Sequence, residues 1–273
     1  MKKLQRSFLE APNALHEPNK PTLQPPDSAM KPFIFSAKPN DGAKHFLGIT
    51  SRGEALSWGK NNLGQLGRDT GGSNSKEPKP VECESNETTI HFVKAYVGGC
   101  SESGHSALLD SKGFLWLAGC DRWQQLGLGS SAGGSSGYTW NQGRVWRNKF
   151  VRNEFLASKM EGSIRDVSLG GDHTIVLSSN QRDVYVFGKG GDGQLGLDGK
   201  PFVSAPTRSK TLSSSGTKIA AVCAMKHCSL TLDDQGKTLA KTGRCSHVVQ
   251  SLEQCIRRAA SQRLLNRDNK AAS

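Results

Sequence analysis

The sequence has no long hydrophobic run and few aromatic side chains. Hydrophobic residues make up 35% of the 273 residues and aromatic residues 7%. No stretch approaches the about 20 apolar residues that a helix needs to cross a bilayer, which excludes a protein built on membrane-spanning helices. The apolar residues instead form short runs, and glycine, with 31 copies, is abundant. This pattern is typical of many short strands joined by tight turns.

Metal-binding spacings are also missing. The seven cysteines contain no Cys-x-x-Cys pair, and the seven histidines are scattered, so we expect no metal site and no cofactor. The basic N-terminus lacks the apolar centre of a secretory signal. We therefore expect free thiols in a reducing compartment, with a cytoplasmic or nuclear location, or alternatively a mitochondrial one.

The motifs of common enzymes are absent, or they match in residue letters but lack the strand or helix that such a motif requires. There is no Gly-x-x-x-x-Gly-Lys-Ser/Thr loop for phosphates. Gly188, Gly190 and Gly193 have dinucleotide-fingerprint spacing, but Gln-Leu-Gly follows them where a helix would have to begin. Residues 133–137 match the Gly-x-Ser-x-Gly pattern of a nucleophile elbow, but they lie in a Ser/Gly-rich stretch with no apolar strand before it. We expect no catalytic residues and a protein that is not an enzyme.

The charge is strongly basic and spread along the chain. The net charge is +12 and the sequence pI is about 9.5. Residues 1–45 hold seven Lys/Arg against four Asp/Glu, or +3, and residues 243–273 hold six against two, or +4, so 12 − 3 − 4 leaves +5 for the middle. A basic field of this kind favours acidic proteins, nucleic acids or anionic surfaces as partners.

One pattern recurs three times. Each copy begins at a histidine, passes through an apolar run, a polar turn and a second apolar run, and ends in Gln-Leu-Gly. A glycine precedes the glutamine by six residues in every copy, and the histidine precedes that glycine by 14, 14 and 15 residues. Internal repeats of this kind indicate stacked structural units. The copies occupy residues 45–67, 105–127 and 173–196.

A fourth, degraded copy covers residues 228–243. Cys228 precedes Gly236 by eight residues, as His105 precedes Gly113, but the Gly-Gln-Leu-Gly signature is missing. Each unit reads as a β-hairpin because two short apolar runs flank a polar turn, in two copies with glycine. We expect the leucine of Gln-Leu-Gly to enter the core and the glutamine to satisfy backbone groups of a neighbouring unit. The repeated histidines are expected to pack or hydrogen-bond and not to act as a catalytic base.

These units resemble the repeats of the regulator of chromosome condensation family, which run Gly-x-x-His-Ser … Trp-Gly-x-Asn-x-x-Gly-Gln-Leu-Gly. Residues 58–67, Trp-Gly-Lys-Asn-Asn-Leu-Gly-Gln-Leu-Gly, follow that pattern throughout, and residues 170–196 follow most of it. The second copy departs from it, with Ala118 in place of Trp and Gln124 in place of Gly. The resemblance covers roughly residues 40–245.

The resemblance implies an all-β fold, a β-propeller of four-stranded blades. Four units are too few for the seven-blade ring of the founding family member, so we expect a partial, degenerate or partner-completed array of about four repeats. The chain could be a fragment, hide degenerate blades, or be completed by a partner or by itself. An open ring would expose strand edges that can pair with other chains.

Three further segments complete the predicted organisation. Residues 1–32 have six prolines and few apolar residues, which predicts a disordered tail before propeller repeats over 33–245. An insertion is expected over 130–160. Residues 246–273 are predicted to form an amphipathic helix and tail, with apolar residues three and four apart. The apolar positions are Val248, Val249, Leu252, Cys255, Ile256, Ala259, Ala260, Leu264 and Leu265.

The insertion holds the candidate binding site. Cations and aromatic rings alternate there, and such a surface can contact phosphates and stack on bases. The alternative is an ordinary surface segment whose aromatic rings pack onto the repeats. The candidate residues are Trp140, Arg144, Trp146, Arg147, Lys149 and Arg152.

Two functions fit these observations. The resemblance implies a non-catalytic scaffold for a protein partner, because the founding family member is a guanine-nucleotide exchange (releasing) factor for a small GTPase and docks on chromatin. The charge and the candidate residues point to the alternative, binding of chromatin or structured RNA. Self-association, or completion of the ring by a partner, is compatible with both.

Overall fold

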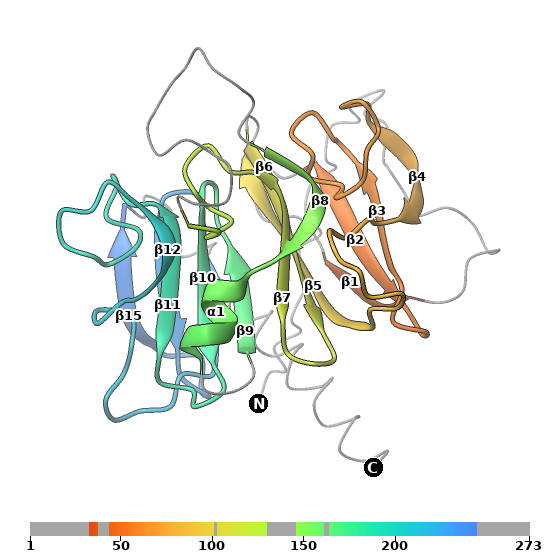
Figure 1. Ribbon diagram of the computed structural model, residues 1–273. Helices are drawn as coiled ribbons and strands as arrows, with labels where there is room; N and C mark the ends of the chain where they lie inside the picture. Colours follow the sequence, from red (N-terminus) through yellow and green to blue (C-terminus); the bar gives the residue numbers. More distant parts are fainter. Residues whose placement is uncertain (1–32, 38–43, 101–102, 130–145, 161–163, 245–273) are drawn as a thin grey trace, which may run out of the picture.

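The computed structural model describes residues 33–37, 44–100, 103–129, 146–160 and 164–244. Within these ranges the fold is four antiparallel sheets, and no helix is long and apolar enough to cross a membrane. The sheets stand side by side in chain order, so the first and the last sheet along the chain lie at opposite sides of the array (Figure 1). The all-β array of four repeats is therefore confirmed. The predicted tail and C-terminal helix lie outside the described residues.

Each sheet is a meander in which consecutive strands pair. Sheet 1 contains β1 (Phe33–Ala37), β2 (His45–Thr50), β3 (Ala55–Gly59) and β4 (Ser75–Pro80). Sheet 2 contains β5 (Phe92–Cys100), β6 (Ser103–Asp110), β7 (Leu115–Cys120) and β8 (Trp146–Arg152). Sheet 3 contains β9 (Ile164–Leu169), β10 (His173–Ser178), β11 (Val184–Lys189) and β12 (Phe202–Arg208). Sheet 4 has three strands, β13 (Ala221–Ala224), β14 (Cys228–Leu232) and β15 (Thr238–Gly243).

The predicted hairpins form, and they share one register. The first residue of each repeat pairs with the glycine that closes the next strand: His45 with Gly59, His105 with Gly119, His173 with Gly188 and Cys228 with Gly243. Gly59 has a φ of 101°, and a Cβ there would lie 2.6 Å from the Lys44 carbonyl oxygen. Glycine therefore recurs at this position because the backbones meet too closely for a side chain.

The hydrophobic cores lie between sheets. Side chains point alternately to the two faces of a strand, so each of the two inner sheets packs against both of its neighbours. Leu47 and Ile49 of sheet 1 pack with Val97 and Leu108 of sheet 2. Equivalent clusters join sheet 2 to sheet 3 and sheet 3 to sheet 4. The leucines of the Gln-Leu-Gly loops, Leu66, Leu126 and Leu195, are buried as predicted, and Leu126 and Leu195 belong to these clusters.

The segment expected to be an insertion contributes regular structure. Residues 146–152 form β8, the fourth strand of sheet 2, and the short helix α1 (Glu154–Lys159) follows. Asn153 caps that helix, because its side-chain oxygen accepts a hydrogen bond from the backbone N–H of Leu156 at 2.9 Å.

The expectation of free thiols holds for only part of the described chain. Cys83, Cys100 and Cys120 are free, whereas Cys223 and Cys228 are disulfide-bonded. Burial raises the pKa of the Cys83 and Cys120 thiols to about 11, so both are unreactive at neutral pH.

Candidate interaction site

The candidate binding segment is mostly an outer strand. Trp140 and Arg144 lie outside the described residues, whereas Trp146, Arg147, Lys149 and Arg152 lie on β8 and are partly exposed. Phe150, between them, is completely buried in the core between sheets 1 and 2. The strand thus brings four of the six predicted residues to one edge of sheet 2, with its central aromatic ring turned inward.

Two of these cations are paired with carboxylates. The Lys149 ammonium lies 2.9 Å from a carboxylate oxygen of Glu82, in the connection that follows β4. The hydrogen bond and charge of Glu82 raise the pKa of Lys149. The isolated bridge between Cys83 and Phe150 holds this connection beside β8.

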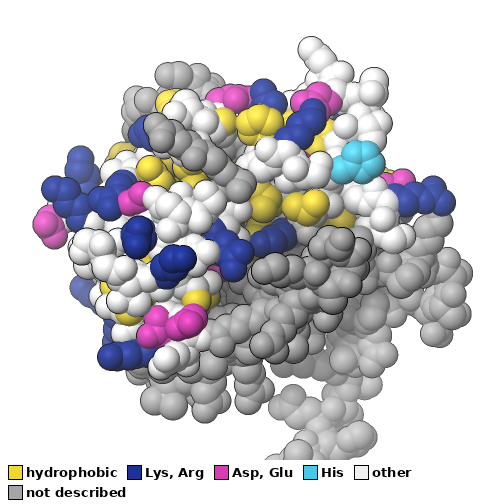
Figure 2. All heavy atoms as spheres, turned by 90° about the horizontal axis from the view of Figure 1, so that it is seen from below, with side chains coloured by type: hydrophobic (Ala, Val, Ile, Leu, Met, Phe, Trp, Pro, Cys, Tyr) yellow, Lys and Arg dark blue, Asp and Glu magenta, His cyan; other side chains and the backbone are white. Residues whose placement is uncertain are grey.

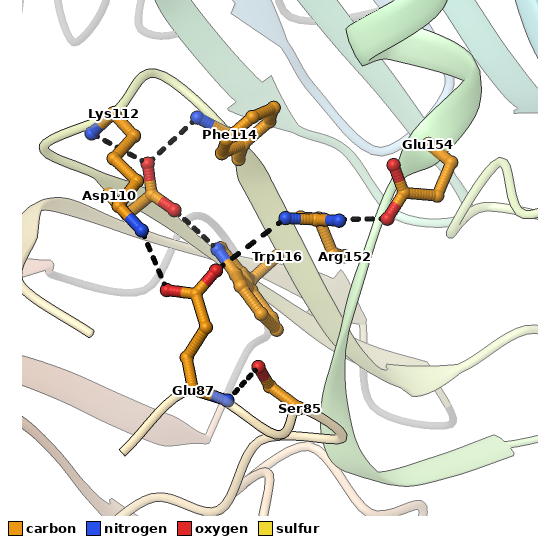
Figure 3. Close-up of polar contacts among 8 residues, drawn as sticks. All are labelled: Ser85, Glu87, Asp110, Lys112, Phe114, Trp116, Arg152 and Glu154. Carbon is orange, nitrogen blue, oxygen red and sulfur yellow. Dashed lines mark hydrogen bonds and ion pairs between the residues drawn. The ribbon is translucent and has the colours of Figure 1, made fainter. Parts of the chain in front are cut away.

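Arg152 lies at the centre of a larger network (Figure 3). Its Nε donates to Glu154 at 2.6 Å, and its Nη1 lies 3.7 Å from Glu87. Its guanidinium also lies 4.7 Å from the centre of the Phe114 ring, which is cation–π distance. Glu87 receives a second cation, Lys112, at 2.9 Å, and this hydrogen bond lowers the pKa of Glu87.

The buried carboxylate of Asp110 lies next to that network and fixes the turn that carries Lys112. One oxygen of Asp110 accepts the backbone N–H groups of Lys112 and Phe114, and the other accepts the indole N–H of Trp116 at 2.8 Å. The turn between β6 and β7 is therefore fixed, and it presents Lys112 to Glu87. Because Glu82, Glu87 and Glu154 partner these cations, the segment carries less uncompensated charge than its sequence indicates.

The repeated histidines form joints between sheets. The Nε2 atom of His45 lies 2.8 Å from the Ser106 hydroxyl of sheet 2. That hydroxyl donates to the Gln65 carbonyl oxygen of sheet 1 at 2.7 Å. Since the hydroxyl proton is used there, Nε2 must carry the proton that the histidine donates. The same arrangement joins sheet 2 to sheet 3 and sheet 3 to sheet 4: His105–Thr174–Gln125 and His173–Ser229–Gln194.

Burial keeps these histidines neutral. Desolvation lowers the pKa of His45 to about 4 and of both His105 and His173 to about 3. A charged imidazole is disfavoured in a site that is shielded from solvent. The predicted structural role is therefore consistent with the geometry, because each of the three side chains is hydrogen-bonded to the next sheet.

The role predicted for the glutamine side chains was wrong. Their Oε1 atoms accept backbone N–H groups of their own loop, two residues earlier, at 2.8–2.9 Å. The contact with the neighbouring sheet is made instead by the glutamine backbone carbonyl. The side chain shapes the loop, and this places the carbonyl where the next sheet's hydroxyl can reach it.

Sequence reasoning missed one charged cluster at the joint between sheets 3 and 4. Asp192 lies within 4 Å of the cations of Lys189 and Arg244 and of the imidazole of His227. Lys189 also lies 5.0 Å from the centre of the Trp123 ring. Asp192 follows the third repeat's closing strand and His227 precedes the fourth repeat, so the repeat alignment could have brought them together.

The comparisons with known proteins agree with this geometry. Profiles of the Regulator of chromosome condensation (RCC1) repeat match residues 52–106, 164–194 and 183–231. The chain therefore carries RCC1 repeats over these residues. It is 29% identical to the protein RCC2 of Mus musculus over 206 residues, which cover 71% of this chain and 37% of RCC2.

Two solved structures share the fold. The crystal structure of human WBSCR16 superimposes with a TM-score of 0.63 at 20% identity, covering 81% of this chain and 51% of that one. Prp20p of Saccharomyces cerevisiae, described with its binding properties to Gsp1p and histones, gives 0.57 at 18%, covering 87% and 47%. The RCC1-repeat chain thus spans about half of these structures and about a third of RCC2.

Proposed function

We propose that this RCC1-repeat chain is a non-catalytic scaffold that binds a protein partner. The observation that carries the proposal is the use of its histidines: the three buried imidazoles are hydrogen-bonded into the joints. Within the described ranges, moreover, no group of three His, Cys, Asp or Glu could hold a metal ion. An array whose buried histidines hold its sheets together is suited to binding a protein partner.

The more specific form of this proposal is guanine-nucleotide exchange on a small GTPase. It is supported by the founding member of the family, an exchange factor, and by the fold shared with Prp20p, which binds Gsp1p and histones. Exchange requires no general acid or base, because the factor only has to distort the nucleotide site of the GTPase.

Two measurements test the scaffold and the exchange activity separately. Light scattering of the purified chain, with and without a candidate GTPase, reports a complex through its molar mass. Release of a fluorescent GDP analogue then reports exchange, which we expect to accelerate at least tenfold at substoichiometric chain. Complex formation without acceleration would reject exchange and keep the scaffold; the failure of every candidate protein to bind would reject both.

Nucleic-acid binding is the second candidate, and the basic surface favours it. Lys and Arg side chains are prominent on the face shown in Figure 2, most of all toward the side of sheets 3 and 4. The affinity for duplex DNA or structured RNA should then fall steeply with salt, with a log–log slope of about −0.7 to −0.9 per phosphate contacted.

The ion pair between Lys149 of β8 and Glu82 allows a more specific test of nucleic-acid binding. Replacing Arg144, Arg147, Lys149 and Arg152 together by Gln should flatten the salt slope if the segment binds phosphates. A matched variant with Glu82→Gln releases Lys149 from its carboxylate and should strengthen binding. An unchanged slope in the quadruple variant would exclude this surface.

We also propose a cytoplasmic or nuclear location, with a mitochondrial one as the alternative. The basic charge suits partners such as chromatin or RNA. Microscopy of the chain fused to a fluorescent protein, with organelle markers, distinguishes the three compartments.

A further inference from the structure

The hydrogen-bonded joint is absent at both ends of the array. In the position of the hydroxyl residues Ser106, Thr174 and Ser229, sheet 1 has Phe46, whose ring stacks on Trp58 with 5.5 Å between the ring centres. In the position of the histidines, sheet 4 has Cys228. The array therefore cannot continue at either end with the joint that holds its four sheets together.

Sheet 4 nevertheless has a second apolar face. Val222 and Ala224 pack against Ile175 and Leu177 of sheet 3. Side chains alternate along a strand, so the neighbours of these residues point away from sheet 3. Cys223, Leu230 and Leu232 form a separate cluster on that outward face, and Cys223 pairs directly with Leu230.

This outward face has the composition of a packed interface. By register, Leu230 and Leu232 occupy the positions at which sheet 3 has Ile175 and Leu177, the residues that pack against the next sheet. Leu230 and Leu232 have 0% exposure, and Cys223 has 7%. Among the described residues no fifth sheet follows to cover them.

We propose that residues 246–273 of the same chain form an amphipathic helix that covers the outward face of sheet 4. The segment begins two residues after Arg244, where β15 has just ended at the rim of that sheet. A helix over 248–265 would be about 27 Å long, enough to span strands of four to six residues. Its apolar stripe would meet Leu230 and Leu232.

The other terminal segment fits this face poorly. Residues 1–32 join the array at β1, in sheet 1, on the opposite side of the molecule (Figure 1). Their six prolines oppose a long helix. A covering helix would take the place of the next sheet of a ring on this face. This inference does not depend on which partner the scaffold binds.

Site-specific photocrosslinking in the full chain tests the proposal. One variant carries p-benzoylphenylalanine in place of Ile256, on the apolar stripe, and the control carries it in place of Gln254, on the opposite side of the helical wheel. Digestion and mass spectrometry then identify the attached peptide. We expect Ile256 to attach within residues 219–243 of the same chain, with at least fivefold the yield at Gln254.

Other crosslinking outcomes would overturn the proposal. These are attachment of position 256 to sheet 1, attachment between two chains, equal yields at both positions, and no crosslink. As a second readout, Ile256→Asp should lower the Tm of the full chain and increase deuterium uptake in β14, whereas Gln254→Asp should do neither. Equal behaviour of these two variants would also reject the proposal.

Discussion

The Nε2 atom of His105 lies 3.1 Å from the hydroxyl oxygen of Thr174, which is 69 residues later in the chain and belongs to the next sheet. Thr174 in turn donates to the Gln125 carbonyl oxygen at 2.8 Å. A single hydroxyl thus connects the first strand of one repeat hairpin with the closing loop of the same repeat. Because all three groups are buried, His105 and the Gln125 carbonyl both depend on the Thr174 hydroxyl for these hydrogen bonds.

Truncating this histidine should weaken the joint between sheets 2 and 3. His105→Ala removes a buried hydrogen bond and leaves a cavity, which together cost about 2–4 kcal/mol of unfolding free energy. Urea unfolding followed by circular dichroism measures the change. The control is His91→Ala, because His91 is exposed and bonds only to a backbone carbonyl of the neighbouring turn. Equal losses in the two variants would contradict the importance of the joint.

Mild acid should destabilise the fold through the same three histidines. Their folded pKa values, about 4, 3 and 3, lie below the unfolded value of 6.5. The unfolded chain therefore binds more protons, so the stabilisation is complete above pH 6.5 and declines as the pH falls toward the folded values. Each histidine contributes a slope of about 1.4 kcal/mol per pH unit in that window.

One carboxyl acts in the opposite direction. Burial raises the pKa of Asp121 to about 6, so the folded chain holds a proton there that the unfolded chain releases. Between pH 7.5 and pH 5 we expect a net loss on the order of 4 kcal/mol in unfolding free energy. Urea titrations at several pH values measure it, and His173→Asn should reduce the slope by one proton. An unfolding free energy that stays constant over this range would refute the prediction that the three imidazoles are buried in their neutral form.

The second repeat carries a strained residue that can be relieved. Gln124 has a φ of 64°, whereas the equivalent positions of the first and third repeats have glycine, Gly64 and Gly193, also with positive φ. Gln124→Gly should stabilise the chain by about 0.5–1 kcal/mol, because removing Cβ relieves the strain by more than it adds unfolded-state entropy. Gln124→Ala keeps Cβ and should give no gain. Thermal unfolding compares the two; a destabilised glycine variant would show that the Gln124 side chain makes compensating contacts.

The central hairpins could be predicted from the sequence, whereas the outer strands could not. The hairpins combine apolar alternation with a glycine imposed by backbone contact, and both are visible in the residues. The strand β4 reads Ser-Lys-Glu-Pro-Lys-Pro, which is polar and contains prolines that only an edge strand tolerates. Its place is set by pairing with β3, and local sequence does not reveal that pairing.

The candidate site shows the same limit. The cations of β8 were visible in the sequence, but Glu82 and Glu87, which pair with Lys149 and Arg152, come from a connection more than 60 residues earlier. Alternating charge and aromatic residues therefore resembled a free binding surface. The repeat histidines were interpreted correctly because three copies of one position indicate a shared structural role, whereas a single copy would not.

Close packing between sheets 2 and 3 gives a further test, with a control matched in backbone geometry. Gly127 has a φ of 64°, and a Cβ there would lie 2.6 Å from the Phe187 ring of sheet 3. Gly71 has a φ of 62°, with nothing within 4 Å of a Cβ. Alanine at either position costs about 1 kcal/mol of left-handed strain.

Gly127→Ala should cost at least about 1–3 kcal/mol more than Gly71→Ala, because the buried Phe187 ring must shift against a packed core. Urea unfolding of both variants measures the difference, which isolates steric contact at the joint from backbone strain. Adding Phe187→Leu to Gly127→Ala should recover part of the loss relative to Phe187→Leu alone. Equal destabilisation by the two alanine variants would show that the loop after Gln125 does not pack on sheet 3 in solution.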